Sequence, residues 1–158
     1  MTARPPREPK PERSSFAAEL ICQLKPLVNA QVPPWELTQV DAAELNWGKG
    51  GAATLEQINK TVPTQACVGA VLGLDEPAYL LSGTKLQRRV TYLPRQGAPE
   101  AAARDGLTYV VIGDIHTETV ARAFHATGWT IQLLAKLGKH SRWTLAINPH
   151  RSDGHCTA

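Results

Sequence analysis

The fold of this chain is decided by residues 107–147, LTYVVIGDIHTETVARAFHATGWTIQLLAKLGKHSRWTLAI. Residues 107–112 form a β-branched and aromatic run, which is typical of a strand. Residues 118–126 carry apolar side chains at helical spacing, and Gly128 follows where a helix C-terminal cap belongs. Apolar and polar residues alternate after Trp129 and again around Trp143, on both sides of a short polar loop, which predicts a β-hairpin. The whole stretch is therefore predicted to form a β-α-β-β unit.

Upstream of this unit the patterns predict more strands and one longer helix. The apolar run over 66–74 predicts a strand buried on both faces, and the alternation over 85–93 predicts a longer one. Residues 52–62 have helical spacing and end at Pro63. Weaker patterns predict a strand at 16–25, for which a helix is the alternative, two short strands at 36–40 and 44–47, and a short helical turn at 100–104.

These elements define a fold class and a domain plan. Strands, a helix and a hairpin without strict strand–helix alternation favour an α+β fold over a doubly wound sheet. We predict one mainly antiparallel, twisted sheet with about two helices packed on one face. A length of 158 residues is that of one domain. Residues 1–15, rich in proline and charge, predict a disordered tail, residues 16–150 the globular domain, and residues 151–158 a frayed C-terminal tail.

Composition excludes several classes of protein. Hydrophobic residues make up 42% of the chain and charged residues 20%, as in a globular protein rather than a disordered one. No apolar stretch approaches the roughly 20 residues that cross a bilayer, so we expect no membrane contact and a cytoplasmic location. The abundance of alanine, arginine and proline suggests a bacterial source.

The cysteines and serines form no recognisable reactive pattern. Cys22, Cys67 and Cys156 are too few and too widely spaced for a disulfide framework or a four-thiolate zinc site. Cys22 and Cys67 lie in apolar runs and are interpreted as small buried side chains. Because no serine lies in a Gly-x-Ser-x-Gly turn and no cysteine has a catalytic signature, we assign no nucleophile.

Charge is unevenly distributed along the chain, whose net charge is +3. Residues 16–80 hold three basic and seven acidic residues, whereas residues 81–158 hold ten basic and five acidic ones. The cationic C-terminal half favours an anionic partner, either nucleic acid or an acidic protein surface. The candidate binding surface consists of Arg88, Arg89, Arg95, Lys136, Lys139, His140, Arg142 and Arg151.

Two tryptophans flank the cations of the predicted hairpin. Trp129 and Trp143 could stack on unpaired bases, as aromatic residues do in proteins that bind single strands. Strand alternation instead places both indoles among apolar residues, which predicts that they pack in the core. Charged hairpin tips also have a simpler role, because they keep sheet edges soluble.

The motif Val110-Val111-Ile112-Gly113-Asp114-Ile115-His116 carries the sharpest chemical signal. A strand that ends in Gly-Asp-x-His resembles the first metal-binding motif of the metallophosphoesterase family, which implies metal ligation by Asp114 and His116. The family's later motifs, one rich in Asp and one of Asn-His, are absent from the 42 residues that follow. A turn at Gly113 and a helix cap at Asp114 explain the same residues without a metal.

The turn Gly48-Lys49-Gly50-Gly51 precedes the predicted helix at 52–62. Such a turn invites comparison with a phosphate-binding loop. It lacks the Gly-x-x-x-x-Gly-Lys-Ser/Thr order, and no continuous apolar strand leads into it. We interpret it as a flexible turn.

Without a credible active site, we predict a non-enzymatic binding or regulatory protein with no cofactor. A small inhibitor or accessory factor of a bacterial DNA-handling or mobile-element system, such as a plasmid or phage, fits this size and charge. The alternative is a metal-dependent phosphoesterase or nuclease that uses Asp114 and His116. That alternative requires more ligands within about 5 Å of Asp114, and the candidates are Asp41, Glu44, Asp75 and Glu76. A structural, oligomer-forming subunit is a third class, which an exposed apolar face on strand 85–93 would favour.

Overall fold

The computed structural model describes residues 38–48, 50–73, 76–83, 85–113, 117–137 and 141–151. The predicted tail at 1–15 and strand at 16–25 lie outside these residues, as does the C-terminal segment after Arg151. The helices are α2 (Gln39–Trp47), α3 (Gly51–Thr61), α4 (Ala98–Arg104) and α5 (Thr117–Ala126), with a 3-10 turn η2 (Ala78–Ser82). The strands are β1 (Cys67–Val71), β2 (Arg89–Tyr92), β3 (Tyr109–Ile112), β4 (Thr130–Leu137) and β5 (Ser141–Ile147).

The five described strands form one mixed sheet in the order β2-β1-β3-β5-β4. Strands β2, β1 and β3 run parallel, whereas β5 is antiparallel to both β3 and β4. The prediction of a mainly antiparallel sheet is therefore wrong. The physical reason is α4, whose length allows the chain to cross from β2 to β3 and enter the sheet in the same direction.

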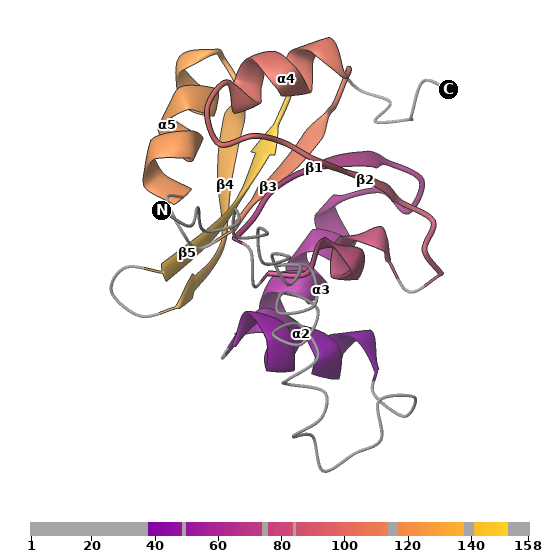
Figure 1. The fold of residues 1–158 in the computed structure, drawn as a ribbon. Coiled ribbons are helices and arrows are strands. Elements are labelled where there is room, and N and C mark those ends of the chain that lie inside the picture. Colours follow the sequence, from indigo (N-terminus) through magenta and orange to yellow (C-terminus); the bar gives the residue numbers. More distant parts are fainter. Residues whose placement is uncertain are drawn as a thin grey trace, which may run out of the picture.

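Helices cover both faces of this sheet, so the prediction of helices on one face only is also wrong (Figure 1). One core packs Val68, Val111 and Leu145 against α2, α3 and η2. The other packs Val110 and Ile112 against α4 and α5. Because both sides of β3 are covered, successive residues of the strand are buried, and Val110, Val111 and Ile112 are all apolar. Four helices and a five-stranded mixed sheet make the described part of the chain an α+β protein.

Helix α2 occupies the region where two short strands were predicted. Its first turn is fixed by a capping box, in which the Thr38 hydroxyl accepts from the Asp41 amide at 3.2 Å and the Asp41 carboxylate accepts from the Thr38 amide at 3.1 Å. Two orphan amides are thereby satisfied, and the helix outcompetes a short alternation of apolar residues. Only Ala42, Ala43 and Trp47 are buried on it.

Strand β2 is shorter than predicted, and β4 is irregular. Leu86 has φ +52 and is exposed, so the backbone of residues 85–88 turns rather than extends before the strand starts at Arg89. In β4 the pairing with β5 shifts between Leu133 and Ala135, which marks a β-bulge. Both strands form the edges of the described sheet.

The two tryptophans of the C-terminal region are buried on opposite faces of the sheet. Trp143, only 1% exposed, lies 4.6 Å from the ring of Trp47 in the α2–α3 core. Trp129 packs edge-on against Phe124 at 4.9 Å in the other core. The prediction that both indoles pack in the core is confirmed, and neither is placed to stack on a base.

Candidate functional site

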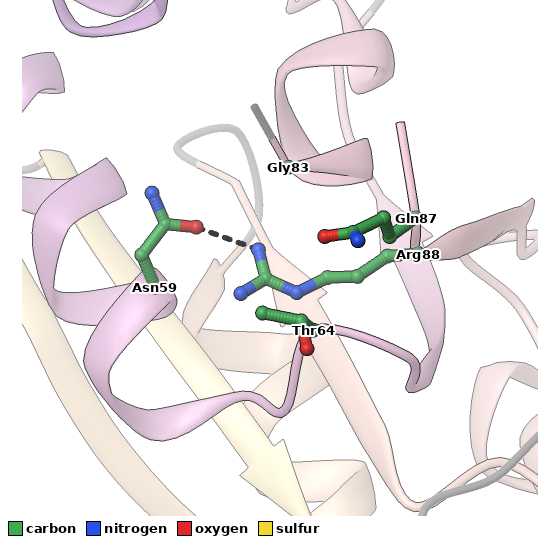
Figure 2. A pocket seen from close by; sticks show the side chains of 5 residues that line it. All are labelled: Asn59, Thr64, Gly83, Gln87 and Arg88. Carbon is green, nitrogen blue, oxygen red and sulfur yellow. Dashed lines mark hydrogen bonds between the residues drawn. The ribbon is translucent and has the colours of Figure 1, made fainter. Parts of the chain in front are cut away.

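A depression of about 220 Å³ lies beside the C-terminal end of α3. Its lining comes from α3, from the segment after it and from the turn before β2, namely Asn59, Thr64, Gly83, Gln87 and Arg88. Figure 2 shows the Arg88 guanidinium reaching between these residues toward Asn59. Among the described residues that line it, Arg88 is the one cation and the others are neutral.

Three hydrogen bonds hold Arg88 in place. Its Nε donates to the carbonyl of Pro63 at 3.0 Å, its Nη2 to the carbonyl of Val62 at 2.8 Å, and its Nη1 to the Asn59 Oδ1 at 2.6 Å. Val62 is the C-cap of α3. Carbonyls at a helix C-terminus lack intrahelical donors and carry partial negative charge, so a guanidinium fits this position.

Arg88 is only 4% exposed and has no carboxylate partner among the described residues. Burial lowers the pKa of its guanidinium, although arginine keeps its proton in proteins at neutral pH. Arg88 was predicted to lie on an exposed cationic surface, and it does not. Strand alternation could not have shown this burial, because residues 85–88 turn before β2 begins and Leu86 is exposed.

The other predicted cations fall into groups at the two ends of the sheet. Arg89 and Arg95 are exposed on and after β2, and Lys136 and Arg142 are exposed on β4 and β5. Because β2 and β4 are opposite edges of the described sheet, these groups do not form one patch. Arg151, also exposed, donates to the carbonyl of Gly106 at 2.7 Å. Lys139 and His140 lie outside the described residues.

Lys136 and Arg142 lie directly opposite each other in the β4–β5 pairing. Both side chains are exposed, and neither has an acidic partner within the described ranges. Like charges at directly opposed positions of an antiparallel pair repel and destabilise the pair. The backbone at this level is tied to α5, because the Thr117 hydroxyl donates to the Arg142 carbonyl at 2.7 Å, and Figure 1 shows β4 and β5 side by side here. We call Lys136 and Arg142 the hairpin pair.

The carboxyl ends of β1 and β3 bring an acidic residue next to the sharpest sequence motif. Asp114, His116 and Asp75 lie outside the described residues, but Glu76 and Gly113 are described. The Glu76 carboxylate, 8% exposed, accepts from the Gly73 amide at 2.6 Å and packs against Gly113, where a Cβ would clash with it. In sheets with parallel strands, the usual binding crevice lies at the carboxyl ends of two neighbouring strands whose following connections leave in opposite directions.

The other two acidic residues considered as metal ligands, Asp41 and Glu44, accept hydrogen bonds from backbone amides at helix N-termini. Asp41 completes the cap of α2. Glu44 accepts from the amides of Gly50 at 3.1 Å and Ala52 at 3.0 Å, at the start of α3. Its carboxylate thus occupies the position where a phosphate-binding loop would hold phosphate. The described ranges contain no group of three or more His, Cys, Asp and Glu residues able to hold a metal.

Cys67, interpreted from the sequence as a small buried side chain, is half-buried and disulfide-bonded. The second cysteine of the bond lies outside the described residues. The odd number of cysteines and their wide spacing had argued against a disulfide framework. That argument failed because spacing along the chain says little about distance in a fold.

Comparison with known proteins yields no relative: no family model, no curated protein and no solved structure matches the chain. Within the described part of the chain, no helix has the length and apolarity that crossing a membrane requires. Function must therefore be argued from the arrangement of the residues themselves.

Proposed function

We propose that this chain is a non-enzymatic binding protein that docks the hairpin pair onto an anionic partner. The proposed role is that of a small inhibitor or accessory factor in a bacterial DNA-handling or mobile-element system. Size and charge are what support the wider role, and the hairpin pair is what supports the docking site.

The hairpin pair is the observation that carries this proposal. Placing a lysine opposite an arginine costs stability, and an acidic residue at either position would remove the repulsion. A partner with negative charge would turn the same repulsion into a favourable contact, because it neutralises both cations at once. The proposal accounts for this unfavourable pair by a role in binding.

Burial of both tryptophans bears on the kind of partner. Proteins that hold single-stranded nucleic acid stack its bases on exposed aromatic side chains, and neither Trp129 nor Trp143 is available for this. An acidic protein surface needs only exposed cations. We therefore favour an acidic protein as the partner, with the phosphate backbone of nucleic acid as the second class.

The test compares Lys136→Glu with Lys85→Glu, which makes the same charge change at an exposed residue before β2. Fluorescence anisotropy would measure binding of an acidic peptide, duplex DNA and single-stranded DNA. Lys136→Glu creates an ion pair with Arg142, so we expect the free energy of unfolding to rise by about 0.2–1 kcal/mol while binding is lost. Equal loss of binding in both variants would mean that binding depends on net charge alone. Intact binding in Lys136→Glu would refute the proposal.

A second candidate function, metal-dependent hydrolysis of phosphate esters, is favoured by the position of Glu76. Gly113, against which Glu76 packs, directly precedes Asp114 in the sequence. Release of nitrophenolate from bis-p-nitrophenyl phosphate with added Mn²⁺ would test it. Hydrolysis that is lost in Asp114→Asn and Glu76→Gln, but kept in Glu100→Gln at an exposed site on α4, would support an enzyme. No hydrolysis by the unaltered chain would reject it.

The lack of a long apolar stretch led us to expect a cytoplasmic location, which stays a prediction. The disulfide at Cys67 argues for an oxidising compartment instead, because cytosolic thiols are kept reduced. Fractionation of the native host followed by immunoblotting decides between the two.

A further inference from the structure

We propose that the depression beside Arg88 is a binding site for a small phosphate group. This site lies next to β2, at the sheet edge opposite the hairpin pair, and does not depend on the proposed function.

The first reason is the charge left over at Arg88. The residue is only 4% exposed, yet every hydrogen-bond acceptor that its guanidinium has among the described residues is neutral. The C-terminal end of α3 offsets about half a unit of charge at most. A buried charge is normally paired, so an anion in the adjoining depression would complete the balance.

The second reason is the number of donors that remain. A guanidinium carries five N–H groups, and three of them are used within the protein. One N–H on each terminal nitrogen is left, and two such groups are what an oxyanion accepts from arginine. Since these donors lie in a buried side chain, they are already oriented before a ligand arrives.

The third reason is the shape and lining of the depression. Gly83 contributes no side chain, and even a Cβ there would stay 3.8 Å from Nη1. Thr64 and Gln87 line opposite sides of the guanidinium (Figure 2) and make no hydrogen bond within the described part of the chain. About 220 Å³ is smaller than pockets for drug-sized molecules, which begin near about 300 Å³. Donors on several sides of a small space suit a tetrahedral oxyanion better than a planar carboxylate.

The experiment titrates the full chain with inorganic phosphate. A parallel titration with chloride at equal ionic strength is the control, because it keeps the screening of charges constant. Two-dimensional NMR is expected to show saturable shifts at the Arg88 Nε–H and at the backbone amides of Asn59, Thr64 and Gln87. Removing the rim donors in Thr64→Val/Gln87→Met is expected to weaken phosphate binding by about tenfold or more, the effect of losing two hydrogen bonds. The phosphate-free melting temperature should not change, because these side chains are exposed.

The variant Lys136→Glu separates this site from the hairpin pair. It should bind phosphate with unchanged affinity, whatever it does to the binding of an acidic peptide or DNA. The proposal is overturned if phosphate causes no more change than chloride, if the double variant binds as tightly as the unaltered chain, or if acetate binds more tightly than phosphate. Equal weakening in Lys136→Glu would also overturn it, since the binding would then follow overall charge.

Discussion

Arg88 connects the end of one helix to the start of one strand through a single side chain. Replacing it by lysine keeps the charge, but an ammonium cannot reach Asn59, Val62 and Pro63 together as a planar guanidinium does. We expect Arg88→Lys to lower the free energy of unfolding by about 2–4 kcal/mol, because buried acceptors lose charged donors. Urea denaturation measures this. The exposed neighbour provides the control, and Arg89→Lys should leave stability unchanged.

Gly51 is required by a close approach of α2 to α3 rather than by its backbone angle. A Cβ at this position would lie 2.8 Å from the carbonyl carbon of Ala43 and 3.0 Å from the Cβ of Trp47. Gly51→Ala should therefore cost about 1–3 kcal/mol of stability, although alanine is the better helix former.

A control for Gly51 is available at Gly128, which has φ +87 and where an added Cβ would meet no atom within 4 Å. Gly128→Asn should cost less than about 1 kcal/mol, because asparagine tolerates the left-handed conformation. Thermal unfolding of both variants tests the contrast, and a larger loss at Gly128 would contradict the packing explanation.

At the level of elements, the start of α3 depends on a carboxylate from α2. Glu44 accepts from Gly50 and Ala52, and Gly50 itself supplies no side-chain cap. Glu44→Ala is expected to lower the free energy of unfolding by about 0.5–2 kcal/mol, as for the loss of an N-terminal cap. Circular dichroism in increasing urea measures it. Glu56→Ala, exposed on α3 itself, should have little effect, and equal losses would exclude the capping role.

Elements with strong local patterns could be predicted from the sequence. Residues 52–62 and 118–126 correspond to α3 and α5, and the apolar run 66–74 contains β1. Prediction failed where local geometry outweighed the pattern. The Thr38–Asp41 capping box made a helix of an apparent strand, and the left-handed Leu86 shortened β2.

For the whole molecule, the disulfide at Cys67 is expected to contribute to stability because it restricts the unfolded chain. Reduction with dithiothreitol should lower the free energy of unfolding by about 2–4 kcal/mol, seen as a lower melting temperature. In Cys67→Ala the melting temperature should no longer respond to dithiothreitol. The same melting temperature for oxidised and reduced protein would show that the bond contributes nothing.

The global arrangement was less predictable than the parts. Strand direction in the sheet depends on how α4 carries the chain from β2 to β3, and no alternation of residues within a strand records its direction. The same holds for the candidate sites. The cations were visible in the sequence, but the separation of Arg89 and Arg95 from Lys136 and Arg142 follows from the strand order.

The bulge in β4 has a consequence for how the molecule behaves at high concentration. An edge strand presents unpaired amides and carbonyls to any neighbouring chain, and a long flat edge invites aggregation. With Leu133 54% exposed on this edge, the register shift beside it breaks the row of hydrogen-bonding groups. Deleting Leu134, which also packs against the α2–α3 core, should straighten the edge, and we expect thioflavin T fluorescence to show more β-rich aggregate than with the unaltered chain.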